Sequence, residues 1–115
     1  MASNFFLVHH TFKPGMAEKW WNNMKNYDET KQKIHLENQL EAGVYCHTFM
    51  PTAKEGPMFC IWEAKEGVSD SEFQNFIDGP NAIGVHMELD HPLNNHCQKI
   101  DHDLIGGEGP YPRRF

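Results

Sequence analysis

A histidine and a glutamate stand among aromatic and β-branched residues in two neighbouring runs of this chain. The runs cover residues 44–50 and 58–64, and the seven residues between them include Pro51, Gly56 and Pro57. Strand-forming runs joined through proline and glycine in this way predict a β-hairpin. The chemistry expected of this chain therefore starts from the side chains that the hairpin presents.

The pairing of the hairpin decides which side chains share a face. Placing Met50 opposite Met58 sets Tyr45 opposite Glu63, and alternate residues of each strand then point to opposite faces. One face carries mostly small groups that suit covering helices: Cys46, Thr48, Cys60, Trp62 and Ala64. The other face carries the residues expected to bind a ligand: Tyr45, His47, Phe49, Phe59, Ile61 and Glu63. An aromatic face that includes a histidine and a carboxylate predicts the wall of a mostly hydrophobic pocket.

The carboxylate on that face needs a partner, because burying an unpaired charge is costly. A strand over residues 5–12 is expected to lie beside residues 58–64, which brings His9 or His10 close to Glu63. A slip of one residue exchanges the two faces, so the sequence leaves open which of these histidines points inward. The candidate catalytic residues are His9, His10, His47 and Glu63, because a His–Glu pair in an apolar cavity can transfer protons. The structural alternative places the pair on the rim, bonded to lysine or solvent.

A second group of possible metal ligands lies in residues 86–91, with the pattern His-x-Glu-x-Asp-His. Imidazole and carboxylate groups suit zinc, nickel or iron when three or more come within bonding distance. The spacing matches neither HExxH nor a paired CxxC site, and Pro92 interrupts any helix that would align the ligands. The sequence therefore predicts no metal and no cofactor. The residues kept as alternative metal ligands are His47, Glu63, His86 and His91.

Composition excludes several classes of partner. Ten basic against 16 acidic residues give a net charge of −6, and Arg113-Arg114 is the longest basic run. Nucleic acids and anionic membrane surfaces require clustered positive charge, so neither is expected as a partner.

Three cysteines outside any CxxC pair predict reduced thiols and a cytoplasmic location. Cys60 is expected to pack under a helix rather than act as a nucleophile, because no histidine shares its face.

Two helical regions are expected to position the hairpin. Apolar residues recur at helical spacing from residue 16 to Tyr27, and the stripe then changes side, which predicts a break near residues 27–30. Gly43 has the position of a C-terminal helix cap. Ser69 and Glu72 form a capping-box pattern before a helix that Gly79-Pro80 ends.

The rest of the chain is expected to supply a last strand and a tail. Residues 96–103 alternate well enough for a strand. Residues 104–115 are rich in glycine and proline and have no core of their own, so the tail is expected to be frayed unless a partner subunit holds it. The 115 residues otherwise form one domain.

The predicted order of elements is β, α, β, β, α, β. Right-handed crossovers then give an α+β, ferredoxin-like antiparallel sheet with strand order 4-1-3-2 and helices on one face. The pattern over residues 5–103, and the run 59–64 followed by a capped helix, resemble the dimeric α+β barrel superfamily and small ferredoxin-like families that include nickel-binding members. The resemblance implies a homodimer and leaves several activities open, among them monooxygenase, isomerase and lyase chemistry.

The expected function follows from the uncovered face of such a sheet. Apolar area in water costs about 25 cal/mol per Å², so two copies are expected to pack face to face and enclose a cavity. The sequence predicts a homodimer that binds a small, mostly hydrophobic organic ligand in this cavity. The alternatives are a divalent-metal protein of the nickel type and a cofactor-free isomerase, lyase or monooxygenase. Whether the protein is an enzyme is left open.

Overall fold

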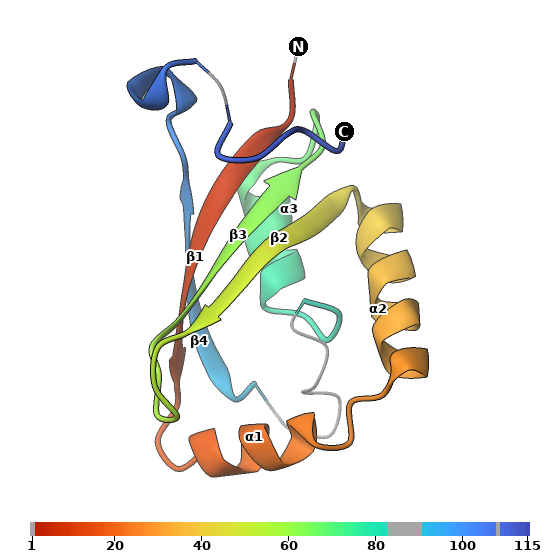
Figure 1. Ribbon diagram of the computed structural model, residues 1–115, viewed down its shortest axis with the longest axis vertical. Coiled ribbons are helices and arrows are strands. Elements are labelled where there is room, and N and C mark those ends of the chain that lie inside the picture. Colours follow the sequence, from red (N-terminus) through yellow and green to blue (C-terminus); the bar gives the residue numbers. More distant parts are fainter. Residues whose placement is uncertain (1, 83–90, 108) are drawn as a thin grey trace.

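The computed structural model describes residues 2–82, 91–107 and 109–115 of the chain (Figure 1). Its elements, in chain order, are β1 (Asn4–Phe12), α1 (Ala17–Met24), α2 (Glu29–Ala42), β2 (Val44–Pro51), β3 (Met58–Ala64), α3 (Asp70–Ile77), β4 (Leu93–Lys99) and a short 3-10 helix (His102–Ile105). None of the helices in these residues is long and apolar enough to cross a membrane.

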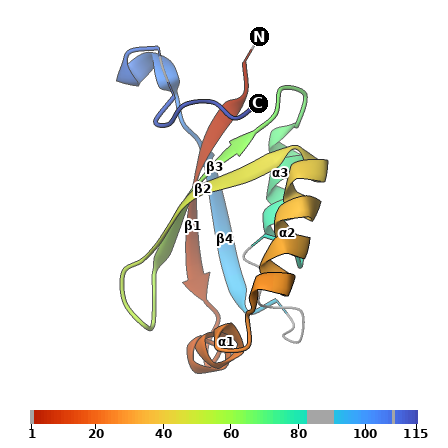
Figure 2. The ribbon, with the colours of Figure 1, turned by 45° about the vertical axis from the view of Figure 1, so that its right-hand side comes forward.

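The four strands form one antiparallel sheet in the order β2-β3-β1-β4. This is the predicted order 4-1-3-2 counted from the other edge, so the α+β class and the sheet topology are confirmed, and both are compatible with a ferredoxin-like fold. Helices α2 and α3 lie on the same side of the sheet (Figure 2). The opposite side, called the open face below, carries no helix in the described part of the chain.

The predicted break between the first two helices is confirmed. α1 ends at Met24, and Asp28 starts α2 by accepting a hydrogen bond from the Lys31 amide over 2.9 Å. Gly43 ends α2 with a φ of 81°, a left-handed conformation that glycine adopts without strain. The backbone there turns directly into β2, so this cap positions the edge strand that carries the candidate site.

The predicted capping box at the start of α3 is also confirmed. The Glu72 amide donates to the Ser69 hydroxyl, and the Ser69 amide donates to the Glu72 carboxylate, each over 3.1 Å. Phe73 and Ile77 then face the sheet, where they pack on Phe6, Trp62 and other buried residues. α3 is thereby fixed against β1 and β3.

The boundaries of the last strand differ from the prediction. β4 runs over Leu93–Lys99 rather than residues 96–103, because it pairs with β1 from Phe12 opposite Leu93 onward. After β4, Asp101 accepts a hydrogen bond from the Asp103 amide and starts the 3-10 helix, which ends the strand geometry.

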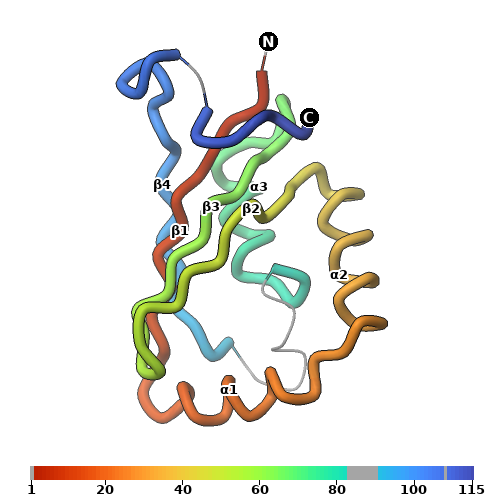
Figure 3. Tube along the Cα trace, in the orientation of Figure 1, coloured from red at the N-terminus to blue at the C-terminus, as the bar shows by residue number. Residues whose placement is uncertain are grey.

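The C-terminal tail, residues 109–115, does not need a partner subunit to hold it. It turns back and crosses β1 and β3 near the N-terminal end of β1 (Figure 3). Gly109 lies so close to the ring of Phe5 that a Cβ atom at this position would overlap the ring. The prediction of an unsupported tail is therefore wrong: the tail covers one end of the open face of its own sheet.

Candidate functional site

Glu63 is the centre of a hydrogen-bonded cluster on the open face. Its side chain is fully buried, and three kinds of donor reach it. The Ser3 hydroxyl donates to Oε2 over 2.6 Å, and His47 Nε2 lies 2.8 Å from Oε1. The backbone amides of Arg114 and Phe115 donate over 2.8 and 3.1 Å. Both oxygens of the carboxylate thus have at least two hydrogen-bond partners in the protein.

These contacts keep Glu63 ionised. Burial opposes the charged form, but the hydrogen bonds from Ser3, the Arg114 amide, His47 and the Phe115 amide together outweigh it and lower the pKa of Glu63. An ionised carboxylate accepts stronger hydrogen bonds than a neutral oxygen. Glu63 is therefore suited to hold the tail, which supplies two of its donors.

Aromatic contacts complete the attachment of the tail. The Tyr111 ring stacks on His47 with 4.8 Å between centroids and 8° between planes, and its hydroxyl bonds the Thr48 hydroxyl. The Arg114 guanidinium lies 4.4 Å from the centroid of the Tyr45 ring, a cation–π contact. The tail thus occupies the part of the open face at which the sequence places Tyr45, His47 and Glu63 as ligand-binding residues.

The predicted contact of His9 or His10 with Glu63 is wrong. Glu63 pairs with Phe5 across the strands, whereas His9 pairs with Phe59, four residues further along β1. His9 is on the open face and stacks on the Phe59 ring at 5.1 Å. Of the four candidate catalytic residues, the structure brings together only His47 and Glu63.

His10 points to the helix side of the sheet. Its ring is completely buried, and Nδ1 lies 2.5 Å from Oδ1 of Asn95 on β4. Burial lowers the pKa of His10, against the effect of the Asn95 hydrogen bond. Its Nε2 has no hydrogen-bond partner among the described residues, which fits a neutral ring that packs in the interior.

The register of the hairpin also differs from the prediction, because β2 contains a bulge. Tyr45 pairs with Glu63 as expected, but the pairing shifts between Cys46 and Thr48, so Met50 lies opposite Phe59 rather than Met58. One extra residue in a strand reverses the faces beyond it. Phe49 therefore packs with the core on the helix side, and its predicted place on one face with His47 is wrong.

A cavity of about 360 Å³, called the inner cavity, lies on this helix side. The residues that line it come from α1, α2, β2, β3, the loop between α1 and α2, and the segment after α3: Met24, Tyr27, Gln32, Leu36, Gln39, Tyr45, Cys46, Phe49, Cys60, Trp62 and Ala82. None of these side chains carries a formal charge at neutral pH in its ordinary form. The ligand residues predicted from the sequence are thus divided: Phe49 lines the inner cavity, His47 and Glu63 belong to the cluster that holds the tail, and Tyr45 contacts both.

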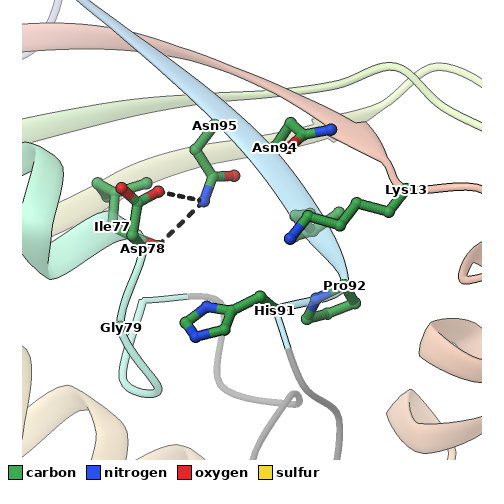
Figure 4. Close-up of a pocket in the computed structure, with 9 residues that line it drawn as sticks. Lys13, Ile77, Asp78, Gly79, His91, Pro92, Asn94 and Asn95 are labelled. Carbon is green, nitrogen blue, oxygen red and sulfur yellow. Dashed lines mark hydrogen bonds between the residues drawn. The ribbon is translucent and has the colours of Figure 1, made fainter.

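A second, more polar cavity of about 400 Å³ lies where α3 ends and β4 begins (Figure 4). Lys13, Asp78, His91 and Asn95 are among its lining residues. The Asn95 amide nitrogen donates to Asp78 Oδ1 over 3.0 Å and to the Ile77 carbonyl over 3.3 Å. These bonds hold the end of α3 against β4.

Three of the four alternative metal ligands lie in the described part of the chain, and these three do not form a cluster. His47 and Glu63 are in contact, and His91 is at the polar cavity, while His86 is outside the described residues. Within residues 2–82, 91–107 and 109–115, no group of three or more histidine, cysteine or acidic side chains is arranged to hold a metal ion.

Sequence reasoning missed the residues that complete the Glu63 cluster. Ser3, Tyr111, Arg114 and Phe115 lie far from Glu63 in the chain, in segments without strand or helix patterns. One signal was present: a tyrosine and two arginines in an otherwise structureless tail are suited to an aromatic face with one carboxylate.

A family model described as a domain of unknown function, DUF8652, matches residues 5–108. No curated protein and no solved structure gave a match.

Proposed function

The chain belongs to this family, DUF8652, and we propose that it binds a small, mostly hydrophobic organic molecule in the inner cavity. The observation that carries the proposal is the cavity itself. Its volume of about 360 Å³ falls within the range of small-molecule sites, which is roughly 300–1,000 Å³. The position differs from the one expected from the sequence, since the tail covers the Glu63 end of the open face.

The lining of the inner cavity favours an apolar ligand with few polar groups. Aromatic rings from Tyr27, Phe49 and Trp62 provide large apolar surfaces, and no described lining residue offers a salt bridge. The polar side chains include those of Tyr27, whose hydroxyl already bonds His35 Nδ1 over 3.2 Å, and of Gln32 and Gln39. Gln39 already donates to the backbone carbonyls of Asn81 and Ala82, over 2.9 and 3.2 Å. Such a lining orients a ligand through one or two hydrogen bonds and gains most affinity from apolar contact.

Leu36 provides the test, because it lines the cavity from α2 and is 38% exposed. Leu36→Trp is expected to fill the cavity from the outer side without disturbing the buried core. The matched control is Ile34→Trp, a change on the same helix at a residue that is 50% exposed and does not line the cavity.

The probe is the uncharged fluorophore N-phenyl-1-naphthylamine, whose emission rises in apolar sites. The native chain and Ile34→Trp are expected to bind it saturably and with equal affinity, whereas Leu36→Trp weakens binding at least tenfold. Equal binding by both tryptophan variants, or no saturable binding by the native chain, contradicts the proposed function.

The part of the open face that the tail leaves uncovered supports the proposed homodimer. It carries four apolar side chains, Leu7, Met50, Phe59 and Ile61, of which Leu7 and Met50 are 38% and 42% exposed. The other side chains on this part of the face are those of His9, Thr11, Asn94, His96 and Gln98. None of these nine residues is a lysine, arginine, aspartate or glutamate, so a second copy meets no charge repulsion there.

Sedimentation at high protein concentration tests the dimer. Ile61→Lys places a charge on the uncovered face and is expected to give monomers, whereas Ile34→Lys, on the outer side of α2, leaves the dimer intact. Sedimentation of the native chain as a single subunit contradicts this part of the proposal.

The other functions predicted from the sequence gain no specific support from the described residues. Direct proton transfer between Glu63 and a ligand requires a free lone pair, and five hydrogen bonds from protein groups already occupy the carboxylate. Cofactor-free catalysis and nickel-type metal binding therefore stay predictions from the sequence.

A further inference from the structure

A groove lies between α1 and the connection that joins β2 to β3, which meet at the same end of the sheet (Figure 1). It has a volume of about 580 Å³ and is called the outer groove, because the four residues that the connection supplies to it are all exposed. The outer groove is lined by Trp21, Met24, Lys25, Pro51, Thr52, Ala53 and Lys54. Neither the tail nor the proposed ligand of the inner cavity occupies it.

Trp21 holds the two sides of the outer groove together. Its indole nitrogen donates a hydrogen bond to the Lys54 backbone carbonyl over 2.6 Å, and this bond joins α1 to the hairpin connection. The half-buried Trp21 ring also packs edge-to-face on the buried ring of Trp20, with 4.8 Å between centroids and 90° between planes. The ring is therefore fixed from two directions and offers its apolar surface as part of a preformed site.

The outer groove differs from the inner cavity in charge. Its surface is mostly apolar, but Lys25 and Lys54 add two positive charges, and none of its lining residues is acidic. Both lysines are exposed, and neither ammonium group has an ion-pair partner among the described residues. Glu55 follows Lys54 in the chain but lines a neighbouring cavity. In a chain with a net charge of −6, this groove is therefore a place that attracts anions.

We propose that the outer groove binds a small organic anion with an apolar body and one acidic head group, a carboxylate or a sulfonate. The body lies against Trp21 and Met24, and the head group pairs with the ammonium groups of Lys25 and Lys54 at the rim. A volume of about 580 Å³ is within the range of small-molecule sites, roughly 300–1,000 Å³. The seven lining residues are too few for a stable protein interface, which uses about 20–30 residues on each side.

This site is separate from the proposed function. Met24 forms part of the wall of both the outer groove and the inner cavity, but none of the other lining residues is shared. The inner cavity offers no cation among its lining residues, and burying an unpaired anion there is costly. An organic anion is therefore expected in the outer groove, and its uncharged counterpart in the inner cavity.

The test compares two fluorophores with one skeleton. 8-Anilinonaphthalene-1-sulfonate is N-phenyl-1-naphthylamine with a sulfonate added, and the emission of both rises in apolar sites. The native full-length chain is expected to bind the sulfonate saturably. Lys25→Gln and Lys54→Gln are each expected to weaken this binding about threefold, and about tenfold together, because exposed ion pairs are individually weak. The control is Lys19→Gln, which removes an exposed charge from α1 outside the groove and leaves the affinity unchanged.

Ala53 allows the opposite change at an exposed position of the groove. Ala53→Glu adds a negative charge beside the head group and is expected to weaken binding of the sulfonate about tenfold. Ala53→Gln adds a side chain of the same size without the charge and is expected to weaken it much less. None of the lysine and Ala53 variants is expected to change the affinity for N-phenyl-1-naphthylamine.

Four results overturn the proposal. They are equal sulfonate affinity in the native chain and the double lysine variant, equal effects of Ala53→Glu and Ala53→Gln, loss of sulfonate binding in Leu36→Trp, and sulfonate binding per chain that falls as the protein concentration rises. The third result means that the sulfonate enters the inner cavity, and the fourth that a second copy covers the groove. Circular dichroism establishes that each variant folds. If one does not, added sodium chloride still decides, because screening weakens binding of the sulfonate and not of the uncharged fluorophore.

The two fluorophores also separate this inference from the proposed function. If the sulfonate binds with the expected dependence on Lys25 and Lys54 but N-phenyl-1-naphthylamine does not bind, the outer groove holds and the proposed function has failed. If only N-phenyl-1-naphthylamine binds, the proposed function holds and the anion site is wrong.

Discussion

Replacing Glu63 by glutamine tests whether this carboxylate holds the tail on the sheet. The change keeps the size of the side chain but removes its charge and turns one acceptor oxygen into an amide donor. That donor then faces groups that also donate, in particular the backbone amides of Arg114 and Phe115. Backbone amides cannot reverse their role. The Arg114 amide donates to both oxygens of Glu63, so either orientation of the glutamine turns one of its two hydrogen bonds into a contact between donors.

The magnitude follows from the hydrogen bonds of the cluster. A hydrogen bond to a charged group contributes about 1.5–3 kcal/mol, and a neutral one about 1 kcal/mol. Glu63 accepts bonds from four groups, of which Ser3 and His47 can exchange donor and acceptor roles and keep a neutral bond. Weakening of the bonds that remain and loss of one of the two Arg114 bonds together predict that the free energy of unfolding decreases by about 2–5 kcal/mol.

Two measurements check this prediction. Urea unfolding gives the change in stability, with Glu66→Gln, an exposed glutamate in the following loop, as the control expected to lie within about 0.5 kcal/mol of the native chain. Hydrogen exchange follows the amides of Arg114 and Phe115, which are expected to lose protection only in Glu63→Gln. Unchanged stability with both amides still protected would refute the role assigned to Glu63.

Three further changes have definite expected outcomes. As pH falls, the amides of the tail are expected to lose protection from exchange, because the pKa of Glu63 is lower in the folded than in the unfolded chain. The stabilisation by ionised Glu63 is complete above about pH 4.3 and disappears as pH falls through the folded pKa. Amide exchange measured across this pH range detects the loss. The pKa of buried His10 is also lowered, so protonation of this histidine in the unfolded chain below about pH 6.5 decreases stability. His10→Gln is expected to flatten this part of the curve of urea midpoint against pH. A curve that keeps its slope contradicts this role of His10. Ser69→Ala removes the hydroxyl that caps α3 and is expected to lower the free energy of unfolding in urea by about 1 kcal/mol. Ser71→Ala, in the same turn, removes a hydroxyl that caps no amide and is expected to lower it by less. Equal losses of stability would argue against the capping box.

Local patterns were sufficient to predict most elements of the fold. The capping box at Ser69 and the left-handed cap at Gly43 depend on residues a few positions apart, and both were found where the sequence indicated them. The order of the strands followed from the order of elements and the handedness of crossovers. The last strand was misplaced because its start depends on pairing with Phe12, some 80 residues earlier, and its own residues are mostly polar.

The candidate site was predictable only in part, since it depends on contacts between distant segments. The contact of His47 with Glu63 lies within one hairpin, and the sequence placed both residues on one face. The partner expected from β1 was wrong because no local signal fixes how far β1 slides along β3; the register puts Phe5, not His9, beside Glu63. The donors that Glu63 needed came instead from the tail, in which no periodicity indicates a contact.

The bulge in β2 explains why the two sites coexist on one strand. In a regular strand His47 and Thr48 would point to opposite faces, but both contact Tyr111 of the tail. Phe49 then turns to the helix side and lines the inner cavity together with Cys46. Apart from Tyr45, which contacts both, the tail and the inner cavity therefore use different residues on opposite faces of β2.

This separation predicts that the two sites can be disrupted independently. Glu63→Gln is expected to release the tail and leave binding of N-phenyl-1-naphthylamine unchanged. Leu36→Trp is expected to weaken that binding at least tenfold and leave the amides of Arg114 and Phe115 protected from exchange. Tyr45 lines the cavity and also contacts Arg114, so both variants keep this residue unchanged. Loss of probe binding in a folded Glu63→Gln would mean that the bulge couples the two faces instead of separating them.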